Sequence, residues 1–359
     1  MANRHMIAWL VMGTLAAPVG AAPDLPMSAS ERAALLQTLS AKLRENYIAP
    51  EVAERTSAAL AAKNASGGYA SVATVQRFSA ALSHDLHAFS GDRHFQAVHD
   101  ERFRERGGDA PAGSAELAQQ RQDHARGGFG IGRVERLAGN VGYLEVRGFG
   151  HSAMVAPAYG AAMALLDGTD ALILDLRRNG GGPPDSVAYL MSHFFAIGDE
   201  RHLHDVVDRP SGKTRQYWTL PTVAQRYDKP VYVLTSARTF SAGEECAYDF
   251  QAQQRGIVVG ESTGGGANPV TRFSVGSGIA VRIPTARTVN AVTGTSWEGS
   301  GVKPDIAVPA AQAQQVAHVA ILKQLRDAAR DPAQRADLAR ALAMVEKGEL
   351  AAPSYTLKQ

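Results

Sequence analysis

A serine stands where a strand-end loop is expected to turn into a helix. It is Ser241, within residues 235–244, which directly follow an apolar run. A hydroxyl at this position lies near free N–H groups and the positive end of the helix dipole, which can stabilise a developing oxyanion. Serine is also a preferred N-cap residue, and for a single serine that is the simpler interpretation. The segment alone leaves both interpretations open.

Three consecutive glycines follow another predicted buried strand. They close residues 175–182, which read DLRRNGGG. Such a run lets the backbone approach a ligand closely and turn its N–H groups toward it, as in an oxyanion pocket or anion nest. A tight strand-to-helix turn would look the same. A phosphate-binding P-loop is excluded because no Lys-Ser/Thr pair follows. The other glycine-rich stretch, residues 127–132, reads as a flexible loop.

The remaining reactive residue types give weaker patterns. His84 and His87 have a spacing that could bind a metal ion on a helix, but further ligands are not apparent, so we interpret them as a solvated face. Cys246, the single cysteine, lies in a helical, partly apolar stretch and is interpreted as a buried structural thiol. We therefore predict no metal site and no cofactor.

Apolar runs of strand length alternate with helical patterns after residue 131. The predicted strands are residues 141–146, 171–176, 231–235 and 256–260, with helices near 156–166, 184–195 and 242–254. This order predicts an α/β core with a mostly parallel sheet flanked by helices on both faces. Residues 272–284 read as a hairpin.

The chain divides into five predicted parts. These are a signal peptide (1–22), an N-terminal helical domain (23–90), a polar connecting segment (91–130), a catalytic core (131–310) and C-terminal helices (311–359). The helical domain shows apolar residues at helical spacing and a helix-start signal at residues 28–31. The stretch between His94 and the first core strand is too short for a PDZ domain, so none is predicted.

The beginning of the sequence and its composition bear on location and partners. Arg4 and His5 precede an apolar run and a small-residue segment ending at Ala22, the layout of a cleaved secretory signal. Its apolar run is interrupted too early for a spanning helix. We therefore predict an exported protein, periplasmic or secreted, with no stable membrane span. The formal charge is only +2 with no Lys/Arg-rich run, so nucleic acid is not a predicted partner.

Four segments resemble the S41 peptidases in sequence and in order. They are residues 175–182 (DLRRNGGG), 239–244 (TFSAGE), 259–266 (VGESTGGG) and 297–305 (WEGSGVKPD). This superfamily contains the tail-specific (C-terminal processing) proteases, the tricorn core protease and the repeats of interphotoreceptor retinoid-binding protein. The helical segment before His94 resembles the N-terminal domain of the retinoid-binding-protein-like branch. The resemblance implies a ClpP/crotonase-like core.

The resemblance also implies roles for individual residues. The serine that opens Ser-Ala-x-Glu in the family is the nucleophile, here Ser241. Tail-specific proteases pair it with a lysine, whose position falls here at Gly266, so a Ser-Lys dyad is excluded. The tricorn-like branch uses histidine and glutamate, which correspond to His94 (in SGDRHF) and Glu298. A base that accepts the serine proton and a third group that orients the base form a coherent site.

The oxyanion would be held by the backbone N–H groups of Gly181 and Ala242, with Gly180 as the alternative if the loop register differs by one. Glu244 is assigned at most a supporting role.

We therefore expect an exported serine-type peptidase that acts on peptides or unfolded proteins. Two alternatives remain at this stage. One is a non-catalytic protein that binds a retinoid or lipid in the same cleft. The other is an esterase or amidase that acts on small molecules. Catalysis is favoured over pure binding because a binding site has no need for serine, histidine and glutamate together.

Overall fold

The computed structural model describes residues 24–101, 103–105 and 113–348. The predicted signal peptide, residues 1–22, lies outside the described residues. Among the helices within those described ranges, none combines the length and the apolar character needed to cross a membrane.

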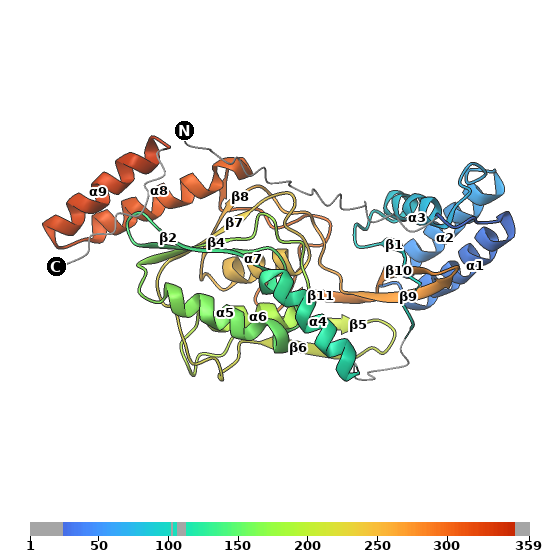
Figure 1. The fold of residues 1–359 in the computed structure, drawn as a ribbon, viewed down its shortest axis with the longest axis horizontal. Coiled ribbons are helices and arrows are strands. Elements are labelled where there is room, and N and C mark those ends of the chain that lie inside the picture. Colours follow the sequence, from blue (N-terminus) through green and yellow to red (C-terminus); the bar gives the residue numbers. More distant parts are fainter. Residues whose placement is uncertain (1–23, 102, 106–112, 349–359) are drawn as a thin grey trace, which may run out of the picture.

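A six-stranded sheet forms the centre of the fold (Figure 1). Its strands, in spatial order, are β12 (Ile306–Ala307), β8 (Ile257–Gly260), β7 (Val231–Thr235), β4 (Ala171–Asp175), β3 (Val141–Val146) and β2 (Ile131–Leu137). All neighbours pair in parallel except β2, which runs antiparallel to β3. The predicted α/β core with a mostly parallel sheet is confirmed.

Helices cover both faces of this sheet. They are α5 (Ser152–Leu166), α6 (Pro184–Ser192), α7 (Ala242–Ala252), α8 (Ala310–Ala328) and α9 (Pro332–Glu346). Leu172, Leu174 and Val233 pack with α5, α6 and α7, whereas the alternate residues Ile173 and Leu234 pack with α8 and α9. Burial on both sides explains why β4 and β7 read as continuous apolar runs rather than as alternating strands.

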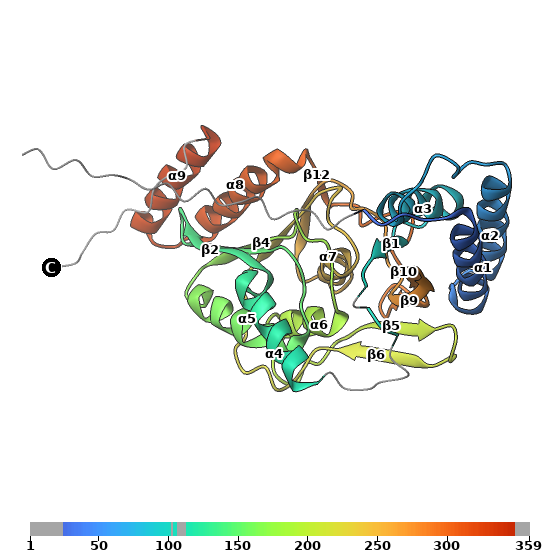
Figure 2. The same cartoon turned by 45° about the vertical axis from the view of Figure 1, so that its right-hand side comes forward.

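A helical unit stands beside the core, as the turned view of Figure 2 shows. It contains α1 (Ala29–Asn46), α2 (Pro50–Ala65) and α3 (Val75–Ser90). A capping box between Ser28 and Glu31 starts α1, and Gly91, with φ 78°, ends α3 in the left-handed conformation. This glycine turns the chain out of α3 directly before His94.

The helical unit shares its hydrophobic core with a small antiparallel sheet. The sheet consists of β1 (Gln96–His99), β10 (Ile279–Pro284) and β9 (Val270–Gly276). Phe78, Leu82 and Leu86 of α3 belong to the same buried cluster as Val281 and Ile283 of β10. The hairpin predicted near residues 272–284 therefore leaves the catalytic core and packs against the N-terminal helices.

Two features differ from the sequence expectations. The connecting segment contains β1 and the helix α4 (Ser114–Arg126), which has no buried residue, followed by a 3-10 turn at η1 (Gly128–Gly130). A second antiparallel sheet was not predicted. It contains β11 (Ala286–Asn290), β5 (His202–Asp208) and β6 (Thr214–Trp218). The strand β6 is mostly exposed and polar, so its sequence lacks the apolar run on which the prediction relied.

Candidate active site

Ser241 occupies a sharp turn between β7 and α7. Its backbone has φ 52° and ψ −124°, a left-handed conformation that is rare for a residue with a side chain. Its carbonyl accepts the N–H groups of Glu244 and Glu245, at 2.8 and 2.9 Å. Strain of about 1–3 kcal/mol at one residue persists only where the surroundings fix it, and it concentrates at functional sites. Strand-to-helix turns of this kind present nucleophilic serines in hydrolases.

His94 lies at the end of the turn that Gly91 opens. It is 9% exposed, and its backbone N–H donates to Asp92 Oδ1 at 2.9 Å. The same carboxylate oxygen lies 3.4 Å from His94 Nδ1, and the other accepts a hydrogen bond from the Tyr47 hydroxyl at 3.1 Å. Asp92 therefore ties the imidazole to the helical unit. The sequence analysis did not assign it a role, although it lies two residues before the predicted base.

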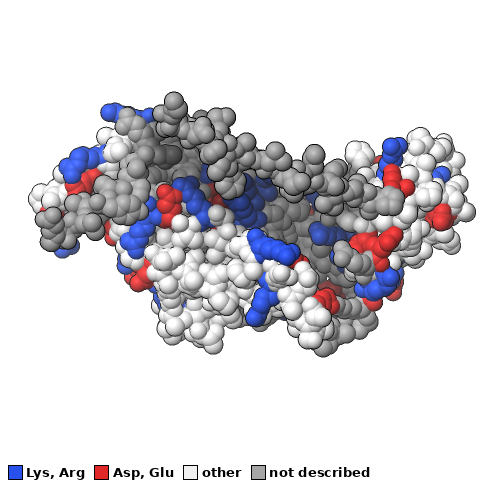
Figure 3. All heavy atoms as spheres, in the orientation of Figure 1, with Lys and Arg blue, Asp and Glu red and all other residues white. Residues whose placement is uncertain are grey.

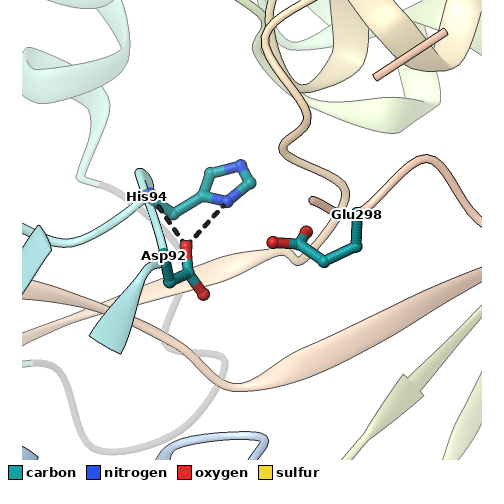
Figure 4. Close-up of side chains that lie close together, drawn as sticks. All are labelled: Asp92, His94 and Glu298. Atoms are coloured by element: carbon teal, nitrogen blue, oxygen red, sulfur yellow. Dashed lines mark hydrogen bonds and ion pairs between the residues drawn. The ribbon is translucent and has the colours of Figure 1, made fainter. Parts of the chain in front are cut away.

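Glu298 reaches the same histidine from the core. Its Oε2 accepts the N–H groups of Ala267 and Asn268, at 2.6 and 3.1 Å. One oxygen of Glu298, one of Asp92 and one nitrogen of His94 all lie within 4.8 Å of one another. Figure 4 shows one ring nitrogen of His94 turned toward both carboxylates and the other turned away. Burial raises the pKa of Glu298, and the charge of Asp92 adds to this effect.

One pocket of about 630 Å³ brings the predicted nucleophile and base together. Ser241, Ala242 and Gly182 line it from the core, and His94 lines it from the helical unit. The His94 ring packs on Phe240, with ring centroids 4.7 Å apart. Neither ring nitrogen of His94 has a hydrogen-bond partner, so the expected contact with the Ser241 hydroxyl is not formed in this structure.

The comparisons with known proteins agree with this arrangement. Residues 140–308 match peptidase family S41, and residues 21–125 match the N-terminal domain of Peptidase_S41 in eukaryotic IRBP. The two matched segments together span well over half of the chain. The chain belongs to peptidase family S41.

Two solved structures similar to this S41 chain support the fold. A lipoprotein from Streptococcus agalactiae has a TM-score of 0.55 at 14% identity, over 84% of this chain and 98% of its own. A candidate peptidase from Parabacteroides merdae has a TM-score of 0.51 at 18% identity, over 79% of this chain and 90% of its own. At these identities the likeness establishes a shared fold.

Glu244 holds the S41 serine turn in place, a function that sequence reasoning largely missed. Its carboxylate is fully buried and accepts four hydrogen bonds. The donors are the Thr263 hydroxyl and the N–H groups of Gly265, Gly266 and Ser241, at 2.5, 2.6, 2.8 and 2.9 Å. Burial raises the pKa of Glu244 and these hydrogen bonds oppose the shift. The Ser-x-x-Glu spacing of a capping box is the sequence signal for this contact.

Gly266, where the sequence resemblance placed the lysine of a Ser-Lys dyad, has no room for a side chain. A Cβ there would lie 2.3 Å from Phe240 Cζ and 2.6 Å from His94 Cε1. His94 and Phe240 therefore occupy the space into which a residue 266 side chain would project. This explains in steric terms why the chain carries glycine where a Ser-Lys dyad needs lysine.

We expect Gly266→Ala to lower kcat/KM by about 100-fold, because a methyl group displaces the imidazole and misplacement by about 1 Å has effects of this size. Steady-state kinetics with a peptide substrate measure it. Gly127→Ala is the control, since a Cβ there meets only ordinary contacts at 3.6 Å. Unchanged kinetics in Gly266→Ala would show that the His94 position tolerates displacement.

The two predicted oxyanion donors differ in whether their N–H groups are already hydrogen-bonded. The N–H of Ala242 has no partner among the described residues. Gly181 lies against Ser241, the predicted nucleophile, since a Cβ there would be 2.7 Å from Ser241 Cβ, but its N–H donates to Asn179 Oδ1 at 2.8 Å. The N–H of the alternative, Gly180, donates to the Arg147 carbonyl at 3.3 Å. The glycine run therefore contacts Ser241, but the N–H of Gly181 is already hydrogen-bonded within its own loop.

A second ionisable cluster lies beneath the pocket. His204 of β5 is fully buried, with Nε2 3.5 Å from Glu245 Oε1 and Nδ1 3.8 Å from Asp249 Oδ2. Burial lowers the pKa of His204, but the charges of Glu245, Asp249 and Asp205 outweigh it and raise the pKa to about 9. The ring also stacks on Tyr217, with centroids 4.7 Å apart.

We expect the melting temperature to fall by several degrees between about pH 6.5 and pH 9. A histidine whose folded pKa lies above its unfolded value stabilises the fold fully below the unfolded pKa. That stabilisation is lost as the pH rises through the folded pKa. Thermal unfolding of the parent across this range measures the fall, and NMR titration of the His204 ring measures its folded-state pKa. A folded-state pKa at or below the unfolded value would exclude His204 as the source.

Proposed function

We propose that this S41 chain is a serine-type peptidase that hydrolyses peptide bonds through an acyl-enzyme on Ser241, with His94 as general base. The observation that carries the proposal is the strained turn of Ser241, which faces a pocket shared with His94. An ordinary helix cap needs no such backbone conformation. A structural histidine needs no pair of carboxylates at one ring nitrogen.

The geometry supports the following sequence of steps. His94 takes the Ser241 hydroxyl proton through the nitrogen that faces away from the carboxylates, and the serine oxygen attacks the peptide carbonyl carbon. Asp92 and Glu298 stabilise the resulting imidazolium and hold its tautomer. The N–H of Ala242 stabilises the oxyanion, joined by Gly181 once its N–H leaves Asn179. His94 then protonates the leaving amine as the C–N bond breaks, and water releases the acyl group.

Peptide binding supplies the closure that these steps require. Ser241 belongs to the core and His94 to the helical unit, so a peptide in the pocket contacts both. Catalytic hydrogen bonds are often long in ligand-free enzymes and tighten in the substrate complex. We therefore place the Ser241–His94 hydrogen bond in the peptide complex.

The proposed setting is outside the cytoplasm, with residues 1–22 as a cleaved signal and peptides or unfolded proteins as substrates.

The pocket carries Arg93, Arg282 and Glu245 on its lining. An apolar retinoid or lipid would desolvate these groups without replacing their interactions with water, which disfavours the binding-protein alternative.

The test is hydrolysis of a mixed peptide library by the mature chain, with the products read by mass spectrometry. The parent and Ser71→Ala, an exposed serine, should cleave the same peptides, and Ser241→Ala should cleave none. Cleavage by Ser241→Ala at the parental rate would overturn the proposal.

A further inference from the structure

Glu245 follows the candidate nucleophile by one helical turn. It is the fourth residue after Ser241, which is the N-cap of α7, and it lies in the first turn of that helix. Glu245 lines the pocket that contains Ser241, although it is only 5% exposed. Its Oε1 has no hydrogen-bond partner. Its nearest opposite charge is the His204 ring at 3.5 Å, longer than a good hydrogen bond, so the buried acid is only partly compensated.

The sheet β11–β5–β6 forms the wall beside Glu245. Val206 of β5 and Thr288 of β11 lie directly opposite each other in register, and both line the pocket. The next same-face pair along these strands is His204 and Asn290. Beyond Val206 and Thr288 the two strands therefore continue into a second, fully buried polar pair, His204 and Asn290.

In the buried layer two carboxylates face only one group that can carry a positive charge. It holds Glu245 and Asp249 against one imidazole, His204, and the distances of 3.5 and 3.8 Å exceed good hydrogen-bond lengths. Asn290 Nδ2 donates to Asp249 Oδ1 at 2.9 Å, which leaves Glu245 as the less satisfied acid. Burial raises the pKa of Glu245, the charge of His204 opposes this shift, and the negative charges of Asp249 and Asp185 add to it.

We propose that Glu245 is the floor of a subsite that binds a lysine or arginine side chain of the peptide substrate. The side chain belongs to the residue whose carbonyl Ser241 attacks, and this inference rests on the proposed function. One turn of helix rises about 5.4 Å, which matches the reach of a lysine side chain from the acylated serine. Its ammonium group would supply the positive charge that the buried acids lack.

Other features of the pocket fit this assignment. On the face drawn in Figure 3, Lys and Arg side chains are scattered over the core and the helical unit, and Asp and Glu side chains lie among them. Of the arginines that line the pocket, Arg93 donates to the Gly264 carbonyl and lies over Phe240, next to His94. Arg282 lies on β10, in register with Gln96. Two arginines therefore lie on the pocket wall near His94, and Glu245 lies on the α7 side.

A metal ion is a poorer fit to the same cluster. The two ring nitrogens of His204 face different carboxylates, Nε2 toward Glu245 and Nδ1 toward Asp249. One nitrogen of His204 and one oxygen of each acid lie within 4.8 Å of one another. The shortest contact of each acid is nevertheless to a different ring nitrogen, as in an imidazolium held between two carboxylates.

The test compares fluorogenic peptides that differ only in the residue before the cleaved bond: Lys, Arg, Leu or Glu. We expect the parent to favour Lys and Arg over Leu by about 30-fold or more in kcat/KM, the range for a buried charge pair. Glu245→Gln should lose this preference and Glu245→Asp should retain part of it. Glu51→Gln, which makes the same change in charge at an exposed position on α2, should keep the parental preference for Lys and Arg.

The outcomes separate this inference from the proposed function. Equal rates for Lys and Leu peptides in a parent whose Ser241 reacts with a fluorophosphonate would overturn the subsite alone. A failure of Ser241 to react would remove the proposed function itself. A stoichiometric divalent metal ion in the purified parent, lost in Glu245→Gln, would also overturn the subsite. The parental preference is measured without any variant, so poor folding of Glu245→Gln does not prevent the test.

Discussion

Replacing His94 with alanine should lower kcat/KM by about 10³-fold or more while leaving the fold intact. His94 is the only histidine of the described chain whose ring lines the Ser241 pocket beside two carboxylates. Without it no base accepts the serine proton, and general acid–base catalysis contributes about 10²–10⁴-fold. The ring nitrogens make no hydrogen bonds in this structure, and the two facing carboxylates keep their hydrogen bonds from Tyr47 and from the Ala267 N–H. Steady-state kinetics and thermal unfolding measure the two effects.

His84→Ala is the matched control for this experiment. His84 is exposed on α3, ten residues before His94, and its loss should leave kcat/KM unchanged. Retention of full activity in His94→Ala would assign the base to another residue. Glu298→Gln and Asp92→Asn then distinguish the roles of the two carboxylates. Substitution of the carboxylate that stabilises the imidazolium should lower kcat more strongly than it raises KM.

Replacing Glu244 with alanine should have the second largest effect, on stability and activity together. The substitution leaves the Thr263 hydroxyl and the N–H groups of Ser241, Gly265 and Gly266 without their acceptor in a buried place. Each unsatisfied buried donor costs about 1–3 kcal/mol, so we expect a loss of at least about 3 kcal/mol in the free energy of unfolding. Denaturant unfolding measures it.

The same substitution should reduce kcat at temperatures where the variant remains folded, because Glu244 fixes the strained Ser241 turn and the loop behind His94. Glu51→Ala, which removes an exposed acid on α2, serves as the control. A stable Glu244→Ala variant with parental kcat would show that the turn holds its conformation without the carboxylate.

The sequence predicted the central sheet well because burial on two faces leaves a strong local signal. The strands at residues 171–175 and 231–235 are uninterrupted apolar runs, and the structure places both in the middle of the sheet. The sheet β11–β5–β6 left no comparable signal, because β6 is mostly exposed. The packing of the hairpin β9–β10 against α1–α3 depends on contacts far apart in the sequence, which local patterns do not encode.

The candidate site could likewise be predicted from the sequence only in part. Ser241 was indicated by its position after a strand, and His94, Glu298 and Gly266 by their place in family-like segments. The sequence could not predict which residues far apart in the chain come into contact at the site. The hydrogen bonds from Gly265 and Gly266 to Glu244 span more than 20 residues, and the Asn179 side chain that engages the Gly181 N–H is visible only in three dimensions. The absent Ser241–His94 hydrogen bond likewise depends on how the helical unit sits against the core.

The most direct test of the central claim is the reaction of the mature chain with a fluorophosphonate probe that carries no basic group, followed by peptide mass spectrometry. Our account predicts one adduct per chain, on Ser241, absent in Ser241→Ala and strongly slowed in His94→Ala. A folded parent that forms no adduct, or an adduct that persists in Ser241→Ala, would contradict it.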